Sequence, residues 1–209
     1  MKNEPVMPLT YEIEEAFHQK GYAMIAGTDE AGRGPLAGPV YAAAVILPDG
    51  VSIEGLNDSK QLSEKKREAL FAEIKEKALS FCVASASVEE IESMNILEAD
   101  LLAMRRAVAG LSVRPDGILV DGNIARGFDR PAFAVIKGDA LCPSVSAASI
   151  LAKVSRDHYC MEMDARYPVY GFAKHKGYGT KDHREAILKY GPCPEHRLTF
   201  LKKLLGKTE

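Results

Sequence analysis

The chain has few cysteines, no long apolar segment and almost no net charge, and the first two shortages exclude particular classes of protein. Its four cysteines, Cys82, Cys142, Cys160 and Cys193, are scattered and form no Cys-x-x-Cys pair. A disulfide framework or a zinc site is therefore not expected. No apolar run approaches the roughly 18 residues that cross a bilayer, and the first ten residues lack the apolar core of a secretory signal. We expect a cytoplasmic protein that does not bind membranes.

The net charge of −2 gives no indication of a polyanionic partner, but the charges are unevenly distributed. From Lys153 to Glu209 the chain has 12 Lys and Arg against 7 Asp and Glu, so the excess of acids lies earlier in the sequence. A metalloenzyme that binds a phosphate backbone would have this asymmetry. A mixed solvated surface would explain it equally well.

Hydrophobic periodicity predicts one α/β domain, a size that suits 209 residues. Strands are expected at 22–26, 40–47, 81–88, 118–120 and 132–136. Helices are expected at 63–79, 96–108, 144–165, 182–190 and 195–205, with a loop at 167–180. Two or three strands come first and the later strands alternate with helices. This order predicts a mixed sheet flanked by helices.

The most informative segment runs from Gly27 to Pro39, where two adjacent acids, Asp29 and Glu30, precede a glycine-rich stretch. Both acids are expected where a strand ends and a turn begins. Carboxylates on a rigid strand end can be directed at a metal, and glycines let a bulky ligand approach the backbone. The alternative is a hairpin turn with two solvated acids.

Two further acids follow predicted strands. Asp121 ends the strand at 118–120, and Asp139 comes shortly after the strand at 132–136. Because ligands of α/β sheets gather outside strand ends, Asp29, Glu30, Asp121 and Asp139 are expected to converge. Oxygen ligands without a Cys or His cluster select Mg²⁺ or Mn²⁺. Taken singly, Asp121 and Asp139 are equally explained as turn residues.

Several long motifs, in order along nearly the whole chain, resemble the ribonuclease HII family. They are Gly27 to Pro39, Asp58 to Lys60, Val120 to Gly122, Lys137 to Asp139, Ser146 to Asp157 and His175 to Thr180. The resemblance implies a ribonuclease H-like fold, with a catalytic domain at 1–190. It also implies a small helical C-terminal extension at 191–209, packed on or near that domain.

The same resemblance implies an activity and a cofactor. Asp29, Glu30, Asp121 and Asp139 would be catalytic metal ligands for Mg²⁺ or Mn²⁺ in a two-metal-ion hydrolysis of phosphodiesters. The implied substrates are the RNA strand of RNA–DNA hybrids and single ribonucleotides embedded in duplex DNA. Cleavage on the 5′ side of the ribonucleotide would leave 3′-hydroxyl and 5′-phosphate ends.

The resemblance also implies residues that recognise the substrate. It assigns Gly32, Arg33 and Gly34 to the 2′-hydroxyl, which distinguishes RNA from DNA. Tyr178 matches the family tyrosine that packs against the adjoining deoxyribose and hydrogen-bonds the same hydroxyl. Lys60 closes a family-like loop near the site and is a candidate phosphate contact, and a solvated surface lysine is its alternative.

Other basic residues allow weaker expectations. Further candidate phosphate contacts are Lys153, Lys174, Lys176 and Lys181. Lys153 lies on the long helix at 144–165 and could instead pair with an acid. The histidines are expected to be surface or structural residues: His158, His175, His183 and His196.

Three other classes compete with this interpretation. Ribonuclease HIII carries an added N-terminal domain, for which Asp29 comes too early, and it differs after the Asp-Glu pair. Another nuclease or a transposase of the same fold would cleave all-DNA duplexes. A non-catalytic nucleic-acid-binding module would be favoured only if one of the four acids were missing. A monomer is expected.

Overall fold

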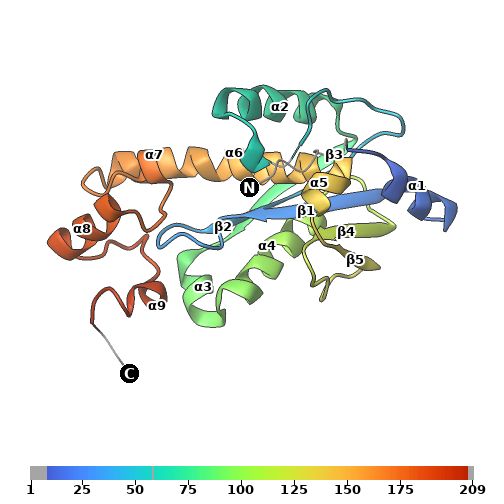
Figure 1. The fold of residues 1–209 in the computed structure, drawn as a ribbon. Helices are drawn as coiled ribbons and strands as arrows, with labels where there is room; N and C mark the ends of the chain where they lie inside the picture. Colours follow the sequence, from blue (N-terminus) through green and yellow to red (C-terminus); the bar gives the residue numbers. More distant parts are fainter. Residues whose placement is uncertain (1–8, 58, 207–209) are drawn as a thin grey trace, which may run out of the picture.

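A five-stranded mixed sheet with the strand order β3-β2-β1-β4-β5 forms the centre of the molecule (Figure 1). The computed structural model describes residues 9–57 and 59–206. The strands are β1 (Ile25–Ala31), β2 (Val40–Ile46), β3 (Ser80–Ala86), β4 (Gly117–Asp121) and β5 (Ala132–Val135). β2 is antiparallel to β1 and β3, whereas β4 is parallel to β1 and β5.

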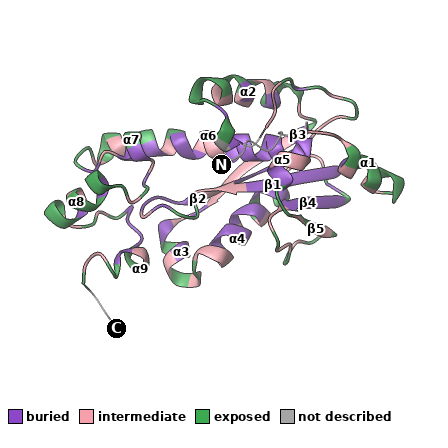
Figure 2. Ribbon diagram, viewed as in Figure 1, coloured by how far each residue is buried: buried purple, intermediate pink, exposed green. Residues whose placement is uncertain are grey.

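Helices cover both faces of this sheet. The helices of the described residues are α1 (Glu12–Gln19), η1 (Ser59–Gln61), α2 (Glu64–Lys77), α3 (Val88–Met94), α4 (Ile96–Ala109), α5 (Gly138–Leu141), α6 (Pro143–Arg166), α7 (Phe172–His175), α8 (Lys181–Tyr190) and α9 (Leu198–Leu201). α2 and α6 lie on one face, and α3 and α4 lie on the other. The buried residues gather on the strands and on the faces of α4 and α6 that meet them (Figure 2). The predicted α/β fold with a mixed sheet is confirmed.

Helix α6 lies directly on the strand that carries Asp29 and Glu30. A Cβ atom at Gly27 would stand 2.3 Å from the carbonyl carbon of Ser144 and the nitrogen of Val145, so only glycine fits there. The carboxylate of Glu14 on α1 accepts hydrogen bonds from the backbone N–H and hydroxyl of Ser144, at 3.2 and 2.9 Å. Glu14 thereby satisfies a backbone donor in the first turn of α6. These contacts fix the position of α6 relative to β1.

The first predicted strand is longer than its apolar run and lies further along the chain. It begins at Ile25 and continues to Ala31, because β2 pairs with it from Gly27↔Val45 to Ala31↔Tyr41. The predicted strand 22–26 is therefore wrong in its bounds. Asp29 and Glu30 lie inside β1, so the hairpin-turn alternative for these acids is wrong too.

Other differences lie in short elements. The predicted strand 81–88 ends at Ala86, because Ser87 caps α3 in a capping box with Glu90. The predicted loop 167–180 contains α7. The predicted helix 195–205 is reduced to α9, because the extended residue Arg197 directs its side chain back into the domain. Helices α1, α3 and α5 had no predicted counterpart.

The structure also bears on membrane-spanning segments and on the cysteines. Within residues 9–57 and 59–206, no helix combines the length and apolarity needed to cross a membrane. The four cysteines are free thiols, with Cys142 and Cys160 buried.

Three histidines form a buried cluster beneath α7, α8 and the C-terminal segment. His175 and His183 stack with ring centroids 4.2 Å apart, and Nε2 of His183 lies 3.0 Å from Nε2 of His196. Nδ1 of His183 donates to the carbonyl of Tyr178, and Nδ1 of His196 accepts from the N–H of Cys193. These partners assign a neutral tautomer to both rings. His158 is exposed and contacts Glu68.

The histidine cluster predicts a loss of stability in acid. Burial lowers the pKa of both His183 and His196 from 6.5 to about 4. Below pH 6.5 the unfolded chain binds protons at these rings while the folded chain does not. The free energy of unfolding should therefore fall as pH drops from about 6.5 to about 4, by up to roughly 3 kcal/mol per histidine. Above that range these two rings contribute no pH dependence.

NMR titration of the imidazole resonances checks this prediction separately from the carboxylates. His183 and His196 should keep neutral-form shifts down to about pH 5, and the same rings should titrate near 6.5 in the urea-unfolded chain. Midpoints near 6.5 in the folded protein would contradict the assignment.

Candidate metal centre

Three of the predicted acids come together at the same edge of the sheet. Thr28 pairs with Val120 in the parallel register of β1 and β4, so the next residues, Asp29 and Asp121, lie side by side. Glu30 follows directly on β1. One carboxylate oxygen from each of Asp29, Glu30 and Asp121 lies within 4.8 Å of the others. The sheet register therefore joins acids that are 92 residues apart in sequence.

The electrostatics of this cluster favour a bound cation. Asp29 is only 3% exposed, and its Oδ1 accepts the N–H of Glu30 at 2.7 Å. Burial, then the charges of Glu30 and Asp121, raise the pKa of Asp29, while a hydrogen bond from Ser149 lowers it. Carboxylates held this close repel one another unless a positive charge neutralises them. Oxygen donors in this number fit Mg²⁺ or Mn²⁺.

Asp139 lies next to this cluster on α5. Asp139 is buried, and its backbone N–H donates to Oδ1 of Asp121 at 3.3 Å. Lys137, two residues earlier, has a positive φ of 60°, which turns the chain from β5 toward Asp121. The carboxylate of Asp139 is not one of the three that lie within 4.8 Å. Its role as a metal ligand stays a prediction.

The acids open into a cavity of about 260 Å³ that contains most of the predicted site. Its lining residues are Asp29, Glu30, Ala31, Gly32, Arg33, Gly34, Ser59, Asp121, Ser149, Lys153, Arg156 and Tyr178. Asp139 does not line it. Lys60 belongs to η1, but its side chain, like residue Asp58, lies outside the described part of the structure.

Two buried arginines hold the glycine-rich loop from its inner side. The guanidinium of Arg197 donates to the carbonyls of Gly32, Arg33, Pro35 and Gly38, at 2.7 to 3.0 Å. Arg156 on α6 donates to Pro39, Ala37 and Lys176. Among the described residues, neither guanidinium lies within 4.0 Å of a side-chain carboxylate. Their positive charges therefore remain under the loop.

Tyr178 stands at the far side of the same loop. A Cβ atom at Gly34 would touch Cε1 of Tyr178 at 3.5 Å, so the ring lies against this glycine. The N–H of Leu36 donates to the carbonyl of Gly177, which joins the loop to the Tyr178 segment. The Tyr178 side chain is 49% exposed and is available to a ligand.

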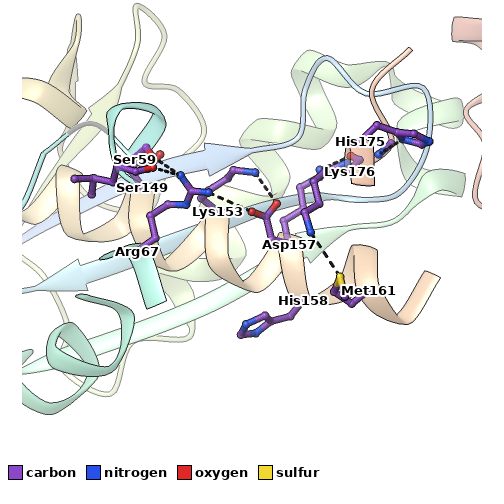
Figure 3. Close-up of polar contacts among 12 residues, drawn as sticks. Ser59, Arg67, Ser149, Lys153, Asp157, His158, Met161, His175 and Lys176 are labelled. Carbon is purple, nitrogen blue, oxygen red and sulfur yellow. Dashed lines mark hydrogen bonds and ion pairs between the residues drawn. The ribbon is translucent and has the colours of Figure 1, made fainter. Parts of the chain in front are cut away.

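Lys153 belongs to a polar network along α6 (Figure 3). Its Nζ donates to Asp157 at 2.5 Å, and Arg67 of α2 lies 3.9 Å from the other carboxylate oxygen. Arg67 also donates to the carbonyl of Ser59, whose hydroxyl is 3.0 Å from that of Ser149. The network connects α2, η1 and α6 beside the acids.

Three other lysines named from the sequence do not line this cavity. Lys174 pairs with Asp182 at 3.0 Å, and Lys181 lies 3.8 Å from Glu185. Lys176 contacts the sulfur of Met161. Of the lysines with described side chains, Lys153 is therefore the best placed to approach a substrate.

One acid near the site was missed by the sequence reasoning. Asp100 on α4 is 1% exposed, and its Oδ2 lies 3.5 Å from Nε of Arg33. Burial, then the charge of Glu30, raise the pKa of Asp100, while Arg33 lowers it. A sequence signal existed, because Asp100 shares a helix face with Ala103, Met104 and Ala107, all of them buried.

The mixed sheet, its flanking helices and the clustered carboxylates together define a metal-dependent nuclease of the ribonuclease H-like class. Comparison with known sequences identifies the family within this class. The chain belongs to the ribonuclease HII family, whose sequence profile, described as Ribonuclease HII, matches residues 26–205.

Individual relatives agree with this assignment. A ribonuclease HII from Albidiferax ferrireducens is 62% identical over 177 residues, which cover 85% of this chain and 86% of that protein. The crystal structure of ribonuclease H2 from Pyrococcus horikoshii shares 29% identity with a TM-score of 0.72, covering 88% of this chain and 98% of that one.

A ribonuclease HIII, Bst-RNase HIII, shares the fold and was solved in complex with Mn²⁺. It has 21% identity and a TM-score of 0.69, and the match covers 91% of this chain and 72% of that one. As a member of the ribonuclease HII family, the present chain is a metal-dependent endoribonuclease of ribonuclease H type 2, a family that acts on RNA–DNA hybrids.

Replacing Arg197 should test how the glycine-rich loop is held. In Arg197→Lys, one ammonium group replaces the guanidinium fork and cannot reach four carbonyls at once. Buried carbonyls would lose their donors, so the free energy of unfolding should fall by about 2–4 kcal/mol, measured in urea. Arg184→Lys, at an exposed position on α8, is the matched control and should unfold like the wild type. Equal stability of both variants would contradict the role given to Arg197.

Proposed function

We propose that the chain cleaves the RNA strand of RNA–DNA hybrids and also cuts 5′ of single ribonucleotides embedded in duplex DNA. The products would carry 3′-hydroxyl and 5′-phosphate ends. The observation that carries this proposal is that one cavity contains both the clustered acids, Asp29, Glu30 and Asp121, and the loop Gly32–Gly34 with Tyr178. A group that hydrolyses phosphodiesters and a group that senses ribose are thereby adjacent.

The acids would hold two divalent cations, Mg²⁺ or Mn²⁺, with Asp139 as a fourth ligand. When bound, the cations would lower the pKa of the attacking water and stabilise the leaving oxygen of the scissile phosphate. The mutual repulsion of Asp29, Glu30 and Asp121 supports this assignment. The choice between the two metals is supported only by their shared preference for hard oxygen ligands.

The chain's own residues would orient the nucleic acid. Arg197 occupies the carbonyls of Gly32 and Arg33 from the inner side, which supports the N–H groups of this loop as donors to the 2′-hydroxyl. Tyr178 would pack on the neighbouring sugar and direct its hydroxyl to the same group. The buried charges of Arg156 and Arg197 favour a polyanionic strand over the loop.

Lys153 and Lys60 are proposed phosphate contacts, and different observations support each of them. Lys153 lines the cavity and is held by Asp157, so its ammonium is already oriented. Lys60 is proposed from its place in η1, next to the cavity residue Ser59. Phosphate contacts would make binding weaker as salt increases.

We also propose an oligomeric state, a domain organisation and a cellular location. One chain supplies every proposed site residue, which supports a monomer as the working unit. Residues 191–209 are proposed as an extension of a catalytic domain at 1–190, and the bonds from Arg197 to the glycine-rich loop support close packing between them. A cytoplasmic location is proposed, and four free thiols are consistent with a reducing compartment.

The first test is the replacement of Asp121. In Asp121→Asn the fold should remain, because asparagine has nearly the same shape, but cation binding and cleavage should be lost. Turnover of a duplex with one ribonucleotide should fall by several orders of magnitude in Mg²⁺ or Mn²⁺. Asp129→Asn removes an exposed acid from the segment between β4 and β5 and is the control, expected to cleave normally. Wild-type turnover in Asp121→Asn, or cleavage of all-DNA duplex by the wild type, would refute the proposal.

A second test concerns ribose recognition by Tyr178. Tyr178→Ala should lower the preference for a junction ribonucleotide by about tenfold, equivalent to about 1.4 kcal/mol, because a stacking and a hydrogen-bonding contact are both lost. Tyr178→Phe keeps the ring and isolates the hydroxyl. Mn²⁺ affinity, measured by calorimetry, should be unchanged in both variants. Unaltered junction preference in Tyr178→Ala would remove this residue from the site.

A further inference from the structure

Asp100 is a buried acid beside the cavity to which no role has been given. It lies on α4, behind Arg33 and outside the cavity lining. We propose that Asp100 is a positioning residue that holds the guanidinium of Arg33 and thereby keeps Glu30 available to a divalent cation. The inference rests on the proposed cation site at Asp29, Glu30 and Asp121.

The geometry places one guanidinium between two acids. Nε of Arg33 lies 3.5 Å from Oδ2 of Asp100, and Nη1 of Arg33 lies 3.8 Å from Oε1 of Glu30. The guanidinium of Arg33 therefore lies between Glu30, an acid of the proposed cation site, and Asp100, an acid outside it. The shorter of the two distances is to Asp100.

The environments of the three groups favour the contact with Asp100. The side chain of Asp100 is 2% exposed, that of Glu30 17% and that of Arg33 49%. Burial and the charge of Glu30 raise the pKa of Asp100, and the guanidinium of Arg33 opposes this rise because its charge is little screened where water is excluded. The side chain of Arg33 is partly exposed to solvent, and its Nε contacts the buried carboxylate of Asp100.

A second observation shows that Asp100 is not explained by packing. Its Oδ1 is buried and has no hydrogen-bond partner among the described residues. It stands on the face of α4 that otherwise carries Ala103, Met104 and Ala107, where an apolar residue would avoid this penalty. We therefore relate the acid at this position to the neighbouring charge of Arg33 and not to the packing of the core.

Removing the carboxylate of Asp100 should redirect Arg33. Glu30 would become the nearest remaining acid, so the guanidinium would move onto it and oppose a cation at the same oxygens. Weaker cation binding would follow without any change in the proposed ligands. The effect should require Arg33, because an alanine at position 33 has no charge to redirect.

Calorimetric titration of the intact chain with Mn²⁺, and separately with Mg²⁺, tests this coupling. Asp100→Asn should weaken cation binding about tenfold in the wild-type background and by less than about twofold in Arg33→Ala. Glu98→Gln is the matched control on the same helix, since Glu98 pairs with Arg126 away from the cavity. It should bind cations like the wild type. Asp100→Ser serves as a second variant if Asp100→Asn does not fold, judged by thermal unfolding.

The outcomes separate this inference from the proposed function. If the wild type binds Mn²⁺ and Asp121→Asn does not, the cation site stands. Wild-type affinity in Asp100→Asn would then overturn the role of Asp100 alone. An equal loss in both backgrounds would also overturn it, because Asp100 would then act by its own charge and not through Arg33. Absence of Mn²⁺ binding by the wild type would remove the site itself.

Discussion

The parallel register between β1 and β4 is the constraint on which the site depends. Because Thr28 lies opposite Val120, the acids that follow these residues emerge side by side from neighbouring strands. A shift of one residue would direct one of the two carboxylates to the opposite face of the sheet. Ala43 of β2, opposite Asp29, and the missing side chain at Gly27 lie on the face that α6 covers and let this helix approach the sheet closely.

The second layer of the site is built from long-range bonds to backbone oxygen. Arg156 comes from α6 and Arg197 from the C-terminal segment, yet both direct their guanidinium groups at the same short loop. The left-handed conformation of Gly32, with φ of 107°, brings the chain so close to Arg156 that a Cβ would lie 2.1 Å from Nε. The loop is therefore shaped by cations beneath it, which also leaves positive charge where a polyanion would lie.

The sequence predicted the layers of the fold and the acidic centre because both follow from local patterns. Apolar runs gave β2, β4 and β5 nearly in full, and acids after such runs gave Asp29, Glu30 and Asp121. The end of β1 was missed because its final residues are polar and are held as a strand by pairing with β2. The short α9 was overestimated, since nothing local reveals that Arg197 bonds to a loop more than 150 residues earlier.

The ion pairs around the proposed cation site join side chains of unequal burial. Lys153 pairs with Asp157, and Arg33 lies closer to Asp100 than to Glu30. Glu30 is more exposed than Asp100 and lies further from the guanidinium, so Arg33 holds it less closely. Asp29, Glu30 and Asp121 bring three carboxylate oxygens together, and a divalent ion is most strongly attracted where negative charge is concentrated in this way.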